Sequence, residues 1–201
     1  MEKGRTDISL TKLEVARRQL VTSIRLFFED ADSVSVYTLA HAAWEVLERL
    51  CKHDNKIYFF DQMVQANQIP KKELRKVATY GRNFFKHADW DPEAVLDGFS
   101  DELNDHVLIS ATYDYGTLAD SKPVEIQLFQ LWYFAAYPEK APVPAFDEIL
   151  KGANEIFPGF SELERAAQKE SGRMNLIKAY SDRGLMSDPS TDTSSVGSIR
   201  N

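Results

Sequence analysis

The chain has 201 residues and a single cysteine, Cys51, so it cannot form an intrachain disulfide. Cys51 lies in an apolar segment with helical spacing, and we expect a buried, unreactive thiol. Residues 1–7 are charged and lack an apolar core, which indicates no signal peptide. The longest apolar run, residues 128–137, is far shorter than the roughly 20 residues of a membrane helix. We therefore expect a cytoplasmic protein with no membrane partner.

Several patterns that identify enzyme classes are missing. The sequence contains no P-loop, no G-x-G-x-x-G, no G-x-S-x-G and no Cys/His zinc pattern. It also has no internal repeat, no long heptad run and no alternating strand pattern. The net charge of -7 argues against a general nucleic-acid coat protein, but a local basic site is compatible with it.

What the sequence does contain is a series of amphipathic segments, with 43% hydrophobic residues to build a core. Apolar residues recur at intervals of three and four over residues 9–29 and 36–51, which predicts two helices. Further helices are expected over 57–64 (where a strand is the alternative), 70–84, 101–118, 123–137, 146–156 and 161–180. The fold class is therefore all-α, an antiparallel helical bundle with additional C-terminal helices.

The chain divides into three predicted parts. Residues 1–140 form the helical bundle, and residues 141–186, which follow a proline-rich break, form a C-terminal helical extension. Residues 187–201 are rich in Ser, Thr, Asp and Gly and have little to bury, so we expect a disordered tail.

The segment Arg-Asn-Phe-Phe-Lys-His at residues 82–87 is the main candidate site. Arginine holds phosphate in a fixed fork, and histidine moves protons near neutral pH. His87 could take the proton from a ribose 2′-hydroxyl, Arg82 could stabilise the phosphoryl charge, and Asn83 could orient either group. Arg82 and His87 would lie about 140° apart on a regular helix, but Gly81 could kink or restart it. These three catalytic candidates require no metal or cofactor.

Basic residues gather around this segment. Residues 71–86 carry six basic side chains against one acidic one, Glu73, a local charge of +5 that could attract a phosphate backbone. The alternative interpretation is a solvated basic face that only keeps the protein soluble. Besides Arg82, the candidate substrate-binding residues are Lys71, Lys72, Arg75, Lys76 and Lys86.

This combination resembles the HEPN superfamily (higher eukaryotes and prokaryotes nucleotide-binding domains). Arg82 and His87 match its R-x4-6-H motif, Asn83 matches the polar residue common after the arginine, and the similarity covers residues 9 to 120. The resemblance implies a metal-independent RNase of toxin–antitoxin or defence type, usually a homodimer, or a relative that only binds nucleotide, RNA or an antitoxin partner. Some HEPN toxins carry a modified tyrosine two residues after the histidine. Asp89 stands there in this chain, so that mode of control does not carry over.

Two other functions remain open. His41 and Glu45 would share one helix face and could bind a metal with His87 or His106, although no convincing third ligand accompanies them. Within the HEPN interpretation, Glu45 could instead orient the Arg/His site across the bundle. The wide apolar stripe around Trp44 would also suit a non-catalytic interaction protein that dimerises through its helices.

Overall fold

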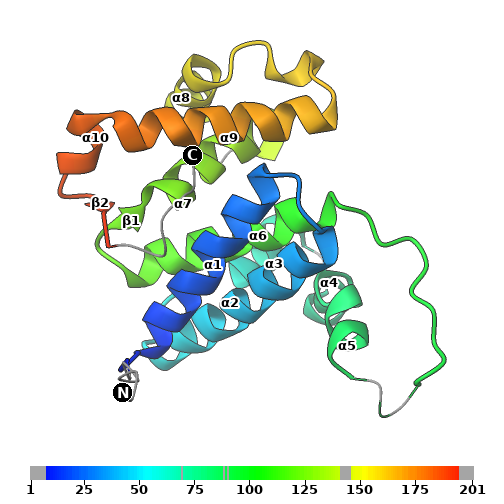
Figure 1. Cartoon of the computed structure of the whole chain (residues 1–201). Helices are drawn as coiled ribbons and strands as arrows, with labels where there is room; N and C mark the ends of the chain where they lie inside the picture. The colour runs from blue at the N-terminus through cyan, green and yellow to red at the C-terminus, as the bar shows by residue number, and fades with distance from the viewer. Residues whose placement is uncertain (1–7, 69, 88, 90, 141–145, 195–201) are drawn as a thin grey trace, which may run out of the picture.

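The computed structural model describes residues 8–68, 70–87, 89, 91–140 and 146–194. It has the all-α architecture that the sequence predicts, with one additional pair of very short strands (Figure 1). The helices are α1 (Lys12–Phe28), α2 (Ser33–His53), α3 (Phe59–Asn67), α4 (Lys71–Ala78), α5 (Tyr80–Lys86), α6 (Leu103–Leu118), α7 (Val124–Ala136), α8 (Phe146–Ile156), α9 (Arg165–Ser181) and α10 (Arg183–Ser187). Short 3-10 turns, η1 (Pro138–Lys140) and η2 (Phe160–Glu162), and strands β1 (Lys122–Pro123) and β2 (Thr191–Asp192) complete the described chain.

Helices α1, α2 and α6 form the centre of the bundle. Thr11 caps α1 by accepting a hydrogen bond from the Glu14 amide at 3.1 Å, and Asp32 caps α2 through the Ser35 amide at 2.8 Å. Both caps supply acceptors to amides that lack a partner within the helix. The short turn between the end of α1 and Asp32 brings α2 back alongside α1 (Figure 1).

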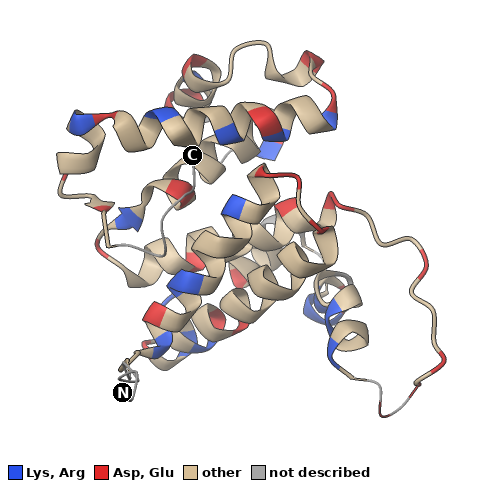
Figure 2. Cartoon of the chain, in the orientation of Figure 1, with Lys and Arg blue, Asp and Glu red and all other residues tan. Residues whose placement is uncertain are grey.

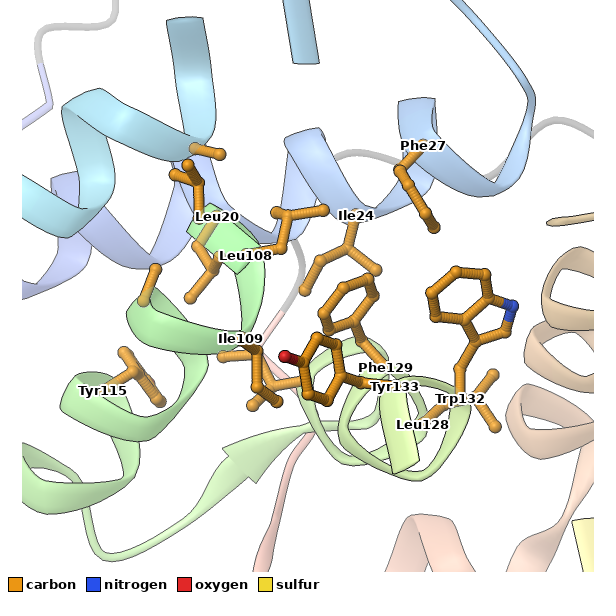
Figure 3. Close-up of a cluster of buried hydrophobic side chains, with 14 of the residues drawn as sticks. Leu20, Ile24, Phe27, Leu108, Ile109, Tyr115, Leu128, Phe129, Trp132 and Tyr133 are labelled. Carbon is orange, nitrogen blue, oxygen red and sulfur yellow. The ribbon is translucent and has the colours of Figure 1, made fainter. Parts of the chain in front are cut away.

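The aromatic core lies where α7 crosses the C-terminal end of α1 (Figure 3). The rings of Phe27 and Trp132 meet edge to face at 5.0 Å, and Phe129 stacks beside Trp132 at 5.7 Å. Trp132 is fully buried, yet its indole N–H donates to the carbonyl of Gln168 on α9 at 2.9 Å. One tryptophan therefore joins the bundle to the C-terminal helices through packing and a hydrogen bond.

Helix α9 is fixed on the bundle by close packing and buried charge. Gly172 lies against the ring of Phe28 on α1, leaving no space for a side chain. Lys169, 2% exposed, binds Asp30 at 2.8 Å and Asp101 at 2.7 Å. The residues of the predicted extension that the structure describes, 146–186, thus pack on the bundle.

The C-terminal segment differs from the predicted disorder. Strand β2 pairs in parallel with β1, and the Arg17 guanidinium of α1 binds the Asp192 carboxylate and the Ser194 carbonyl. Thr191 is buried. Composition gave no sign of these contacts, because they satisfy polar groups rather than bury apolar ones. Residues 195–201 of the predicted tail lie outside the described residues.

The helix predicted over residues 70–84 is two helices, α4 and α5, which are divided at Thr79. Gly81, expected to be the break, instead lies inside α5. A Cβ at Gly81 would lie 3.2 Å from the ring of Tyr37 on α2, so the glycine permits a close approach of the two helices. Helices α4 and α5 lie at one end of the molecule, apart from α8 to α10 (Figure 1).

Candidate functional site

A pocket of about 260 Å³ lies between α2 and the pair α4–α5. Its volume is slightly below the roughly 300–1,000 Å³ of drug-sized ligand sites and suits a small polar group. The lining is dominated by charged side chains and consists of His41, Trp44, Glu45, Glu48, Arg49, Lys52, Arg75, Thr79 and Arg82.

One polar stripe of α2 supplies most of this lining. His41, Glu45, Glu48, Arg49 and Lys52 recur at intervals of three and four, so they project from one side of the helix. The other buried residues of α2 are apolar and pack into the bundle. The sequence singled out His41 and Glu45 but not Glu48, Arg49 or Lys52. The signal that could have found them is a charged stripe on one side of a helix whose buried face is mostly apolar.

Arg75, one of the predicted phosphate ligands, is held rigidly in the wall. Its two terminal nitrogens bind the two carboxylate oxygens of Glu48 at 2.8 and 2.6 Å, and its guanidinium lies 3.8 Å from the centre of the Phe60 ring. Burial alone would raise the pKa of Glu48, but hydrogen bonds from Arg75 and Lys52 outweigh it and lower that pKa. Glu48 therefore stays ionised and fixes both cations.

Arg82 reaches into the same pocket from α5. Its guanidinium forms an ion pair with Glu45 of α2, and the second oxygen of that carboxylate binds Lys86 at 2.9 Å. Asn83 contacts Arg82 through its side-chain oxygen at 3.4 Å, a long hydrogen bond. Glu45, Asn83 and Lys86 thus all touch Arg82 or its partner, so the structure brings these residues together around one guanidinium.

His41 forms part of the pocket floor and is 1% exposed. Its Nε2 lies 2.8 Å from the Ala78 carbonyl at the end of α4. Burial lowers the pKa of His41 to about 4, and the positive charges of Arg82, Lys86 and Arg75 act in the same direction. The ring is therefore neutral at physiological pH.

Arg49 differs from the other cations of the pocket. Its side chain is exposed, and within the described part of the chain it forms no hydrogen bond or ion pair. Lys52 binds Glu48 and lies 4.7 Å from the centre of the Tyr58 ring. The lining holds four cations and two carboxylates, so it carries a net charge of +2 in a chain of net charge -7.

His87 is not part of this pocket. It follows the last residue of α5, its backbone is extended, with φ -130° and ψ 116°, and its side chain is exposed. Its amide donates to the Asn83 carbonyl at 3.1 Å, and its ring has no partner among the described residues. Within one copy of the chain, Arg82 points into the pocket and His87 lies at the end of the helix.

The remaining predicted phosphate ligands are spread over the surface of α4. Lys71 is held by Asp61 at 2.7 Å and by the Tyr58 hydroxyl at 3.1 Å. Lys72 and Lys76 are exposed and contact no partner in the described residues. The basic residues of α4 and α5 are followed along the chain by acidic residues on the loop after α5 (Figure 2).

A buried carboxylate supports the pocket floor from behind. Asp114 on α6 accepts hydrogen bonds from the Trp44 indole at 3.1 Å and from the Phe59 amide at the start of α3 at 2.6 Å. Burial raises the pKa of Asp114 to about 7, although both hydrogen bonds oppose the shift. Cys51 lies beside it, buried as expected, and burial raises the pKa of its thiol to about 12.

The structure offers little support for a metal site at His41 and Glu45. Across the described ranges, no group of three or more His, Cys, Asp or Glu side chains is arranged to hold a metal ion. His41 binds a backbone carbonyl, and Glu45 binds two cations.

No helix in the described part of the chain combines the length and apolar composition needed to cross a membrane. We compared the chain with protein-family models, curated proteins and solved structures. None of them matched. The site's own geometry is therefore the basis for any functional proposal.

Proposed function

We propose that the pocket between α2 and α4–α5 binds the phosphate groups of a nucleotide or of RNA, in a helical protein of HEPN type. The observation that carries this proposal is the convergence of four cations on one small pocket in an acidic chain. Two of them, Arg75 and Arg82, belong to the basic segment that the sequence singled out. Guanidinium groups match the oxygens of phosphate, which makes a phosphate the natural ligand.

The pocket is suited to a ligand with more than one negative charge. Glu45 and Glu48 already engage Arg82, Arg75 and Lys52, so a weakly charged ligand would compete poorly with them. Arg49 is free to make the first contact from the rim, since no described residue binds it. A polyanion such as RNA would meet Arg49 first and Arg82 afterwards.

Metal-independent RNA cleavage is the second candidate. It is favoured by the exposure of His87, which can meet a substrate or a second copy of the chain, on the same short helix as Arg82. Cleavage in EDTA would leave cyclic phosphate ends, because the 2′-hydroxyl is the attacking group. If RNA stays intact, or if His87→Ala cleaves as fast as the wild type, the cleavage candidate is rejected and only the binding proposal is left.

The binding proposal is tested by fluorescence anisotropy with a short labelled single-stranded RNA at low salt. Arg49→Gln should weaken binding by roughly fivefold, the equivalent of about 1 kcal/mol for one exposed charge contact. Lys151→Gln is the matched control, since it removes the same charge from an exposed position on α8 outside the lining. Equal weakening by both variants would indicate unspecific attraction, and no binding by the wild type would reject the proposal.

A further inference from the structure

Two buried nitrogens in the pocket lack hydrogen-bond partners. They are Nδ1 of His41 and Nε of Arg82, and both residues line the pocket. Buried polar atoms without a partner are unfavourable, so each needs an explanation. The other two among the described residues, on Gln19 and Asn104, lie outside the pocket lining. That two of them belong to one charged pocket indicates a ligand that satisfies both.

The chemistry of that ligand follows from the contacts of His41. The Ala78 carbonyl can only accept a hydrogen bond, so Nε2, 2.8 Å away, carries the proton. Because the ring is neutral, Nδ1 is left with a lone pair and must accept. Arg82 Nε, in contrast, always carries a hydrogen and can only donate. The pocket therefore offers one unpaired acceptor and one unpaired donor.

We propose that His41 recognises a ribose 2′-hydroxyl while Arg82 holds the adjacent phosphate, so that the pocket selects ribonucleotides over deoxyribonucleotides. The hydroxyl donates to His41 Nδ1, and a phosphate oxygen accepts from Arg82 Nε–H. This inference rests on the proposed phosphate-binding function and adds the substrate class. His41 is then a specificity-determining residue of the pocket.

Binding requires one rearrangement. Neither nitrogen is open to water in this structure. Arg82 and Glu45 are 30% and 34% exposed in their side chains, and an ion pair so accessible to water is weak. The ligand phosphate takes the place of the Glu45 carboxylate and turns Arg82 away from α2, which opens a path to His41.

The test compares wild-type affinities for a short RNA, its 2′-deoxy counterpart and its 2′-fluoro counterpart, which keeps the ribose pucker but cannot donate a hydrogen bond. The RNA should bind roughly tenfold more tightly than either analogue, because each analogue loses one well-aligned hydrogen bond. Salt-sensitive binding with equal affinity for all three would overturn this inference and leave phosphate binding intact. Absence of binding by any of them would reject the proposed function itself.

Two variants distinguish the roles of the two ring nitrogens of His41. His41→Gln places an amide N–H near Nε2, keeps the Ala78 contact and removes the acceptor, so the preference for RNA should disappear. His41→Asn places an amide near Nδ1, retains an acceptor and loses the Ala78 contact, so the preference should remain. The opposite pattern would contradict the assignment.

A measurement on the wild-type protein does not depend on whether these variants fold. In ¹⁵N NMR, the Nδ1 resonance of His41 should move upfield with RNA, as for a nitrogen that accepts a hydrogen bond. It should stay in place with 2′-fluoro RNA. The same movement with both would overturn the hydroxyl assignment.

Discussion

Arg82 on α5 forms an ion pair with Glu45 on α2, and Lys86 binds the other oxygen of the same carboxylate. The arginine that the sequence predicts to hold a phosphate is therefore held by an internal anion. Glu45 positions Arg82 in the pocket and at the same time competes with a ligand for it. The sequence suggested that Glu45 could orient the Arg/His site from across the bundle. Among the described residues Glu45 contacts Arg82 but not His87.

Replacing Glu45 by glutamine should strengthen phosphate binding. The variant keeps a hydrogen-bond acceptor for Arg82 but removes the competing charge, and an increase in RNA affinity of roughly fivefold is expected. Glu14→Gln is the control, because Glu14 makes a similarly exposed ion pair with Arg18 on α1, outside the pocket lining. An affinity that falls in Glu45→Gln alone would show that positioning outweighs competition.

Asp114 should make stability depend on pH. Its pKa is raised from 3.8 to about 7 in the fold, so the folded chain binds an extra proton between these values. Stability from this group is therefore present at low pH and is lost as pH rises from about 4 to about 7. Asp114→Asn removes the titration, and it also loses one acceptor for the Trp44 or Phe59 N–H.

Urea unfolding of both proteins across this range isolates the effect. The stability of the wild type relative to Asp114→Asn should fall as pH rises and then level off near pH 7. His41 contributes stability that rises with pH, because the fold lowers its pKa. This contribution is the same in both proteins and cancels in the difference between them. A difference that does not change with pH would contradict this account of Asp114.

Gly172→Ala should destabilise the protein although it lies within helix α9. Alanine normally favours a helix over glycine by about 1 kcal/mol. Here its methyl group would collide with the Phe28 ring, and overpacking typically costs roughly 1–3 kcal/mol. Gly152→Ala in α8 is the matched control, since its Cβ would make an ordinary 3.6 Å contact with Leu131. Thermal unfolding should show a lower Tm for the first variant and an unchanged or higher Tm for the second.

His87→Ala should leave RNA binding unchanged, whereas Arg82→Gln should weaken it. His87 lies outside the pocket lining and its ring has no partner among the described residues, whereas Arg82 faces the pocket. Anisotropy titrations of both variants with the same RNA check this. Equal losses would mean that the binding surface continues over the end of α5 to His87.

The fold was predictable because its signals are local. The apolar spacing of α1 and α2 and the Asp32 cap define helices without reference to the rest of the chain. Strand β2 was not predictable, since the pairing of Asp192 with Arg17 joins residues from opposite ends of the sequence. The division at Thr79 was not predictable either, because Gly81, the local signal for a break, lies inside α5.

The site was predictable only in part, because its contacts join helices that lie far apart in the sequence. Local charge density identified Arg75 and Arg82, because they lie in one basic segment of the sequence. It could not show that Glu45 and Glu48 would neutralise them, or that Arg49 would complete the pocket from another helix. It also suggested Lys72, which the fold leaves outside the lining.

The most direct test of the phosphate site is an NMR titration of ¹⁵N-labelled protein with a short single-stranded RNA. Amide shifts should concentrate along residues 41–52 of α2 and residues 75–86 of α4 and α5, and the Nε–H signals of Arg82 and Arg49 should move as well. Shifts confined to α8 and α9, or no shifts at RNA concentrations well above that of the protein, would contradict the proposed phosphate site.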